Sequence, residues 1–77
     1  MPPTIEIRLF ATLRRLLPAS ANNYPIEPGM SLSDLIDKLK IPRHQAKLIF
    51  INGRRADQRS MLKDGDRVGI FPPVGGG

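Results

Sequence analysis

Hydrophobic residues in this chain follow two different periods, which leaves few arrangements open to it. Thr4–Leu9 alternates between apolar and polar or charged residues, a pattern typical of a strand with one buried face. A helical period follows in the middle of the chain, where one apolar stripe comprises Leu32, Leu35, Ile36 and Leu39. Leu48–Ile51 is apolar on both faces, as expected of a central strand, and Arg67–Phe71 predicts the last strand. One sheet covered on one face by one main helix accounts for this order, which makes the domain α+β.

Capping and turn residues mark the ends of these elements. Ser31 is placed to cap the main helix, Asp34 can return the contact, and Ile41-Pro42 ends the helical run. Asn52-Gly53 predicts a tight hairpin that leads into a brief edge strand over Arg54–Ala56. The remaining predicted elements are a short helix over Ala11–Leu17 that Pro18 ends, a strand over Tyr24–Glu27, and turns at Pro28-Gly29 and Lys63–Asp66.

Length and composition limit what this domain can do. Its 77 residues form one small domain, whose core rarely contributes more than about 3–5 kcal/mol, so a deep catalytic cavity is not expected. The absence of cysteine excludes disulfides, a zinc site built on thiolates and a thiol nucleophile. The sequence contains neither a signal-peptide pattern nor a run of about 20 apolar residues, so we expect a soluble, cytoplasmic protein with no membrane contact.

The end of the chain predicts a narrow arm rather than a pocket. A folded body over residues 1–71 is followed at residues 72–77 by two prolines, a valine and three glycines. Proline favours extended geometry, and glycine lets a backbone pass where other residues would clash. The arm would reach at most about 20 Å, far enough to enter the cleft of a partner enzyme. The alternative is a frayed terminus or a linker.

Four segments resemble, in order, those of one protein family. Arg8–Arg14 (RLFATLR) looks like the first strand and helix of the MoaD/ThiS sulfur carriers, and Leu48–Arg54 (LIFINGR) like their mid-chain strand and hairpin. Leu62–Val68 (LKDGDRV) is similar to their penultimate turn. Phe71–Val74 followed by terminal glycines most resembles the small, sulfur-carrier subunit of molybdopterin synthase. The resemblance covers nearly the whole chain.

This resemblance implies a ubiquitin-like β-grasp fold and a protein substrate rather than an enzyme that acts alone. In that family an adenylating enzyme of the ubiquitin-activating type uses ATP and magnesium to convert the terminal carboxylate, here that of Gly77, into an acyl-adenylate. A persulfide sulfur donor then supplies the sulfur of a thiocarboxylate, which a recipient enzyme uses: the large subunit of molybdopterin synthase or an equivalent acceptor. Partner contacts are expected from Phe71, Pro72, Pro73, Val74, Gly75 and Gly76. No metal and no stably bound cofactor is expected on the chain itself.

Other functions within the family remain open. Gly75 makes a third glycine where the familiar end has two, and this weakens assignment to one branch of the family. Related carriers serve other pathways such as thiamin synthesis, and some family members are ubiquitin-like modifiers that are joined to proteins through the terminal glycine.

The net charge of +5, with Arg14-Arg15 and Arg54-Arg55, also admits a basic nucleic-acid-binding module. We expect no nucleic-acid partner, because the chain has only three phenylalanines and one tyrosine and three of these four are predicted at sheet positions, leaving no stacking platform. The arginines are then either a solvated face or a surface steered towards an acidic partner.

Two residues in the body of the domain are also site candidates. His44 is the only histidine and is expected in a solvated loop rather than in a metal site. Phe71 either completes the core or stays partly exposed beside the arm as an interface anchor, and we favour the second role.

Overall fold

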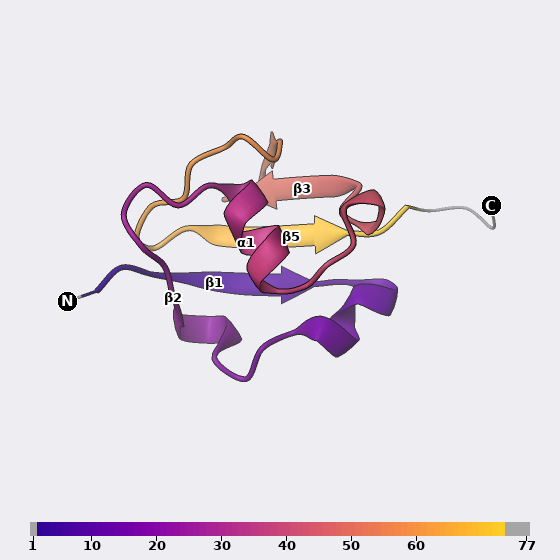
Figure 1. Cartoon of the computed structure of the whole chain (residues 1–77), viewed down its shortest axis with the longest axis horizontal. Helices are drawn as coiled ribbons and strands as arrows, with labels where there is room; N and C mark the ends of the chain where they lie inside the picture. The colour runs from indigo at the N-terminus through magenta and orange to yellow at the C-terminus, as the bar shows by residue number, and fades with distance from the viewer. Residues whose placement is uncertain (1, 74–77) are drawn as a thin grey trace.

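Five strands form a single mixed sheet, with one α-helix in front of it (Figure 1). The computed structural model describes residues 2–73; Met1 and residues 74–77 lie outside the described part. The strands are β1 (Thr4–Leu9), β2 (Tyr24–Pro25), β3 (Leu48–Ile51), β4 (Arg54–Ala56) and β5 (Arg67–Phe71). Their order across the sheet is β2-β1-β5-β3-β4, and only β1 and β5 run parallel. The α+β arrangement predicted from the hydrophobic periods is therefore confirmed.

The core lies between α1 (Leu32–Lys38) and one face of the sheet. Alternation in β1 buries Ile5, Ile7 and Leu9 on that face, while the intervening side chains point to the opposite, open face. The predicted helical stripe is buried as well, including its last residue, Leu39, which follows the helix. The sheet consequently has one face covered by α1 and one open face.

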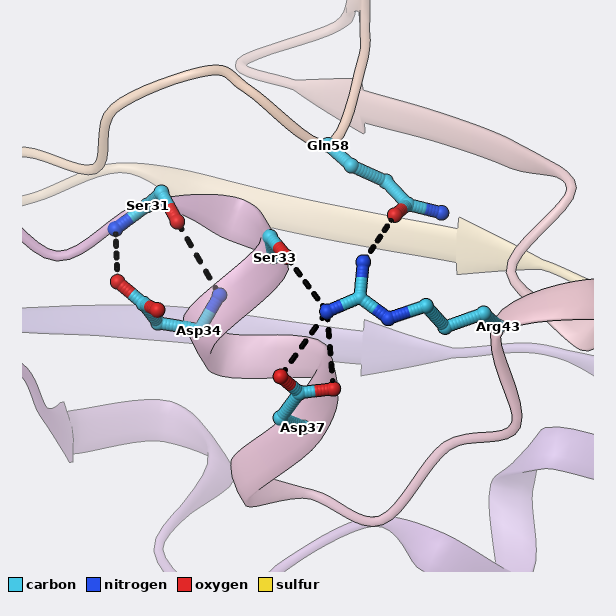
Figure 2. Close-up of polar contacts among 6 residues, drawn as sticks. All are labelled: Ser31, Ser33, Asp34, Asp37, Arg43 and Gln58. Carbon is cyan, nitrogen blue, oxygen red and sulfur yellow. Dashed lines mark hydrogen bonds and ion pairs between the residues drawn. The ribbon is translucent and has the colours of Figure 1, made fainter.

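The helix begins with the capping box that the sequence predicted. The Ser31 hydroxyl accepts a hydrogen bond from the Asp34 N–H at 3.2 Å, and the Asp34 carboxylate accepts one from the Ser31 N–H at 3.0 Å (Figure 2). Two of the N–H groups that a helix start leaves without partners are satisfied in this way.

A single arginine ties three segments together on the helix side of the domain (Figure 2). Arg43 lies in the 3₁₀ helix η3 (Arg43–Gln45), and its guanidinium donates to Ser33 Oγ at 2.6 Å and to both carboxylate oxygens of Asp37. It also donates to Gln58 Oε1 at 2.6 Å. Arg43 thereby connects α1, η3 and the loop that follows β4.

The shorter elements differ in extent from their predictions. The helix predicted over Ala11–Leu17 is a 3₁₀ helix, η1 (Ala11–Leu16), because Leu17 precedes Pro18 and adopts an extended backbone. Another 3₁₀ helix, η2 (Ala21–Asn23), precedes β2, which ends two residues earlier than predicted at a proline that suits only an edge strand. β3 is an inner strand, but the middle of the sheet is occupied by β5.

The hairpin between β3 and β4 forms at Asn52-Gly53, where both residues have positive φ angles of 54° and 80°. The Asn52 side chain also holds the start of β5: its Nδ2 donates to Asp66 Oδ1 at 2.9 Å, and its Oδ1 accepts from the Arg67 N–H at 2.9 Å. Asp66 is buried and accepts a further bond from the Lys63 N–H at 2.8 Å. This network fixes β5 at its first residues.

Candidate functional site

Three of the seven predicted site residues lie in the described part of the chain. Phe71 ends β5 and is half-buried, Pro72 is buried, and Pro73 is exposed. Val74, Gly75, Gly76 and Gly77 lie outside the described residues. Within the described part, the exposed portion of the predicted arm therefore starts at Pro73, while Pro72 packs against the body.

The backbone is held in the sheet until the arm begins. The Phe71 carbonyl accepts a hydrogen bond from the Lys47 N–H at 3.0 Å, and the neighbouring Ile70 carbonyl accepts one from the Phe10 N–H at 3.2 Å. Because β1 and β5 are parallel, their carboxyl ends lie at the same end of the sheet, where η1 also begins (Figure 1). The sheet thus sets the position and direction at which the chain leaves β5.

Three phenylalanines gather on the open face at this end of the sheet. The rings of Phe10 and Phe71 stack in parallel planes with their centroids 4.1 Å apart. The Phe50 ring meets Phe71 edge-on at 5.8 Å between centroids and 83° between planes. All three residues are half-buried, so Phe71 is partly exposed as predicted, and its role as an interface anchor stays a prediction. We call these three residues the aromatic cluster.

Sequence reasoning placed three of the four aromatic residues at sheet positions but did not find that Phe10, Phe50 and Phe71 gather into the aromatic cluster. Phe50 and Phe71 alternate with the buried Ile49 and Ile70, which assigns both rings to the open face. The sequence does not give the strand order that brings Phe10 beside Phe71 through the parallel pairing of β1 with β5. Strand order was the missing information.

A shallow hollow of about 430 Å³ lies beside the aromatic cluster. Its lining comprises Arg8, Phe10, Phe50, Gly53, Arg67, Val68, Gly69 and Phe71. Gly69 pairs with Phe50 on one side and Arg8 on the other, so the middle of the open face carries no side chain at this position. A Cβ added at Gly69 would lie 3.5 Å from the Phe10 ring, an ordinary contact, so alanine fits here while a larger side chain would fill the hollow.

Arginine side chains surround this apolar surface. Arg8 and Arg67 line the hollow, and Arg55 stands opposite Phe50 in the β3–β4 pairing, which puts both on the open face. All three arginines are exposed. Glu6 lies on the same face and pairs with Arg8 at 2.7 Å between carboxylate oxygen and Nε. The candidate site is an apolar, aromatic surface with basic edges at the exit of the arm.

His44, Asp64 and Asp66 lie apart from the aromatic cluster. His44 is exposed on η3, and residues 2–73 contain no group of three or more His, Cys, Asp or Glu side chains arranged to hold a metal ion. Asp64 accepts a bond from the Thr4 N–H at 2.9 Å, and Asp66 belongs to the network at the start of β5. No helix in the described part is long and apolar enough to cross a membrane.

Comparison with known proteins agrees with this architecture. No curated protein is similar enough to the chain to count as a relative. Two structures of small archaeal modifier protein 1 (SAMP1) from Haloferax volcanii share the fold, with TM-scores of 0.68 and 0.71 at 21% and 19% identity. They cover 96% and 94% of this chain, and the match spans 99% of each of them. The fold is therefore the ubiquitin-like β-grasp that the resemblance implied.

A third structure is more similar in sequence. It is a Pyrococcus furiosus protein provisionally described as molybdopterin converting factor, subunit 1, which is 31% identical with a TM-score of 0.64. That match covers 94% of this chain and 99% of the other. The sequence model of the ThiS family matches residues 7–77, from the first strand to the last glycine. This chain is therefore a member of the ThiS family of ubiquitin-like sulfur carriers and modifiers.

Proposed function

We propose that this protein is a sulfur carrier whose terminal Gly77 is adenylated and then thiocarboxylated, and that it delivers this sulfur in molybdopterin biosynthesis. The observation that carries the proposal is the continuity between the aromatic cluster and the arm: Phe71 belongs to the cluster and is separated from Gly77 by five residues. A partner that docks on the open face therefore lies within reach of the terminal carboxylate.

Activation of the carboxylate is required because an anionic carboxylate is a poor acyl electrophile. A carboxylate oxygen of Gly77 attacks the α-phosphorus of ATP, which forms the acyl–phosphate bond and releases pyrophosphate. A persulfide sulfur of the donor then attacks the carbonyl carbon, and AMP leaves with that carboxylate oxygen. A thiol cleaves the sulfur–sulfur bond of the resulting acyl disulfide, which leaves the thiocarboxylate on Gly77 and a disulfide on the donor.

The work is divided between this chain and its partners. ATP and magnesium bind to the adenylating enzyme, which also stabilises the charge that develops at the carbonyl. This chain contributes the docking face and a terminal segment narrow enough for a closed channel, since glycine has no Cβ. The recipient of the sulfur is the large subunit of molybdopterin synthase or an equivalent acceptor.

The assignment to molybdopterin is supported by two observations. The Pyrococcus furiosus protein at 31% identity is provisionally described as a molybdopterin converting factor subunit, and the Phe71–Val74 segment resembles the end of that kind of subunit. A second candidate function is conjugation to other proteins through Gly77, which the similarity to SAMP1, a modifier by its name, favours.

Intact mass of the protein isolated from its own cells tests the proposal. A mass increase by one oxygen-to-sulfur exchange, mapped to Gly77 with a thiocarboxylate-specific alkylating probe, is expected. The matched control is a chain that lacks Gly76 and Gly77, which should remain unmodified. The reading as a sulfur carrier is contradicted if the wild-type end stays a carboxylate when it is incubated with its adenylating enzyme, ATP and sulfide. Isopeptide-linked conjugates in the same cells would support the modifier role instead.

A further inference from the structure

We propose that Arg8, Arg55 and Arg67 form a basic rim that selects the partner: an adenylating enzyme whose docking surface has an apolar centre edged by carboxylates. This inference rests on the proposed function and names the chemistry of its first partner. Sulfur delivery and protein conjugation both start with activation of Gly77, so the activating enzyme is the partner that either role requires.

The position of the rim is set by the sheet. Arg8 in β1 and Arg67 in β5 line the hollow beside the aromatic cluster, and Arg55 in β4 faces the same side opposite Phe50. The three arginines therefore come from three different strands and surround one apolar surface. A partner that covers the aromatic cluster must also cover or approach their guanidinium groups.

The positive charge of the three arginines is only partly neutralised by carboxylates of the open face. Glu6 pairs with Arg8, but neither Arg55 nor Arg67 forms a side-chain ion pair within residues 2–73. With three arginines against one glutamate, these four residues leave the face with a charge of +2. Docking would remove water from guanidinium groups, which is unfavourable unless the partner supplies acceptors. Carboxylates match the planar guanidinium best, because the two can form paired hydrogen bonds.

Aromatic rings edged with arginines could also bind single-stranded nucleic acid, but the ring geometry favours a protein. Bases bind by stacking on free ring faces. Phe10 and Phe71 already stack on each other at 4.1 Å with parallel planes, so each has one face covered. Phe50 meets Phe71 edge-on rather than forming a row of parallel rings. A compact cluster of this kind suits an apolar docking pocket, where aromatic and arginine side chains commonly carry the binding energy.

The experiment compares two triple variants with equal loss of charge. The rim variant is Arg8→Gln, Arg55→Gln and Arg67→Gln. The control variant is Lys38→Gln, Lys40→Gln and Arg59→Gln, which removes three exposed charges from α1 and from loops outside the open face. Neutral glutamine is used rather than glutamate, because a second carboxylate beside Glu6 would add repulsion. Urea melts of both variants establish that they fold.

Activation is measured by ATP–pyrophosphate exchange with the adenylating enzyme encoded in the same genome, over a range of salt concentrations. The rim variant is expected to lose about 10- to 100-fold in kcat/KM at low salt, through KM rather than kcat, with a flatter salt dependence. The control variant is expected to stay within about twofold of the wild-type chain.

Three results would overturn the inference, and they are distinguishable. Equal kcat/KM for the rim and control variants would remove the rim as a selecting element while leaving the proposed function intact. Absence of exchange with the wild-type chain itself would contradict the proposed function and the inference together. The third result uses a single-stranded uridine oligonucleotide as the probe: salt-dependent binding that requires the rim, with activation unchanged, would assign the face to nucleic acid instead.

Discussion

The stacked pair Phe10–Phe71 should stabilise the domain by an interaction that a double-mutant cycle can isolate. Replacing either ring by leucine keeps an apolar side chain and removes the stack. The centroids are 4.1 Å apart at 0°, so with the ring planes in contact at about 3.5–4.0 Å the two rings are displaced sideways by about 1–2 Å. An offset stack of this kind is one of the arrangements that aromatic pairs prefer, so we expect a coupling energy within the usual range, about 0.5–1.5 kcal/mol.

The single variants should differ in a defined order. Phe71→Leu loses the stack on Phe10 and the edge contact with Phe50, whereas Phe10→Leu loses only the stack. We therefore expect Phe71→Leu to cost more, with each kcal/mol lowering Tm by about 4–8 °C in a domain of this size.

The assay is urea unfolding of the wild type, both single variants and the double variant. The coupling energy comes from the four free energies of unfolding, and the slopes of these free energies against urea concentration are compared across all four proteins. Leu32→Ala, in the core at the first residue of α1, combined with Phe71→Leu provides an additive control. A coupling energy below about 0.3 kcal/mol, which is within the scatter of independent sites, would refute the reasoning. So would a larger loss for Phe10→Leu than for Phe71→Leu.

Three further predictions concern single positions. Gly77→Ala should leave the urea midpoint unchanged but sharply lower thiocarboxylate formation, measured by intact mass; comparable losses in folding and thiolation would contradict the role of Gly77 as a reactive end. Ser31→Ala removes the hydroxyl of the capping box and should cost about 1 kcal/mol in a urea melt, whereas Ser31→Asp should retain most of the stability. Asp66→Ala leaves the Asn52 amide and the Lys63 N–H without their acceptor and should cost about 1–3 kcal/mol, and a loss below that of Ser31→Ala would show that the network at the start of β5 is unimportant.

The sequence predicted those parts of the fold that depend on neighbouring residues. Alternation located β1, helical spacing located α1, and Ser31 with Asp34 located its start, because each signal is local. The Asn52-Gly53 turn was equally clear, since its backbone requires two positive φ angles. The extents of η1 and β2 were less accurate, since Pro18 and Pro25 decide them through backbone restrictions rather than through hydrophobic pattern.

For the candidate site, the sequence predicted only features that depend on residues next to one another in the chain. The partial exposure of Phe71 followed from the sequence, but the aromatic cluster and the arrangement of Arg8, Arg55 and Arg67 depend on strand order and register. These positions are remote in sequence and are joined only when β5 enters between β1 and β3. No local pattern carries that information, so the open face had to be obtained from the structure.

The middle position of β5 makes the proposed docking face dependent on a completed fold. β5 is the last strand in the sequence, yet it pairs with β1 on one side and with β3 on the other, so the sheet stays in two halves until residues 67–71 join it. Aromatic partners for Phe71 come from both halves, Phe10 from one and Phe50 from the other. An activating enzyme that requires this face would ignore nascent or truncated chains, so ATP would be consumed only on molecules whose folding is finished.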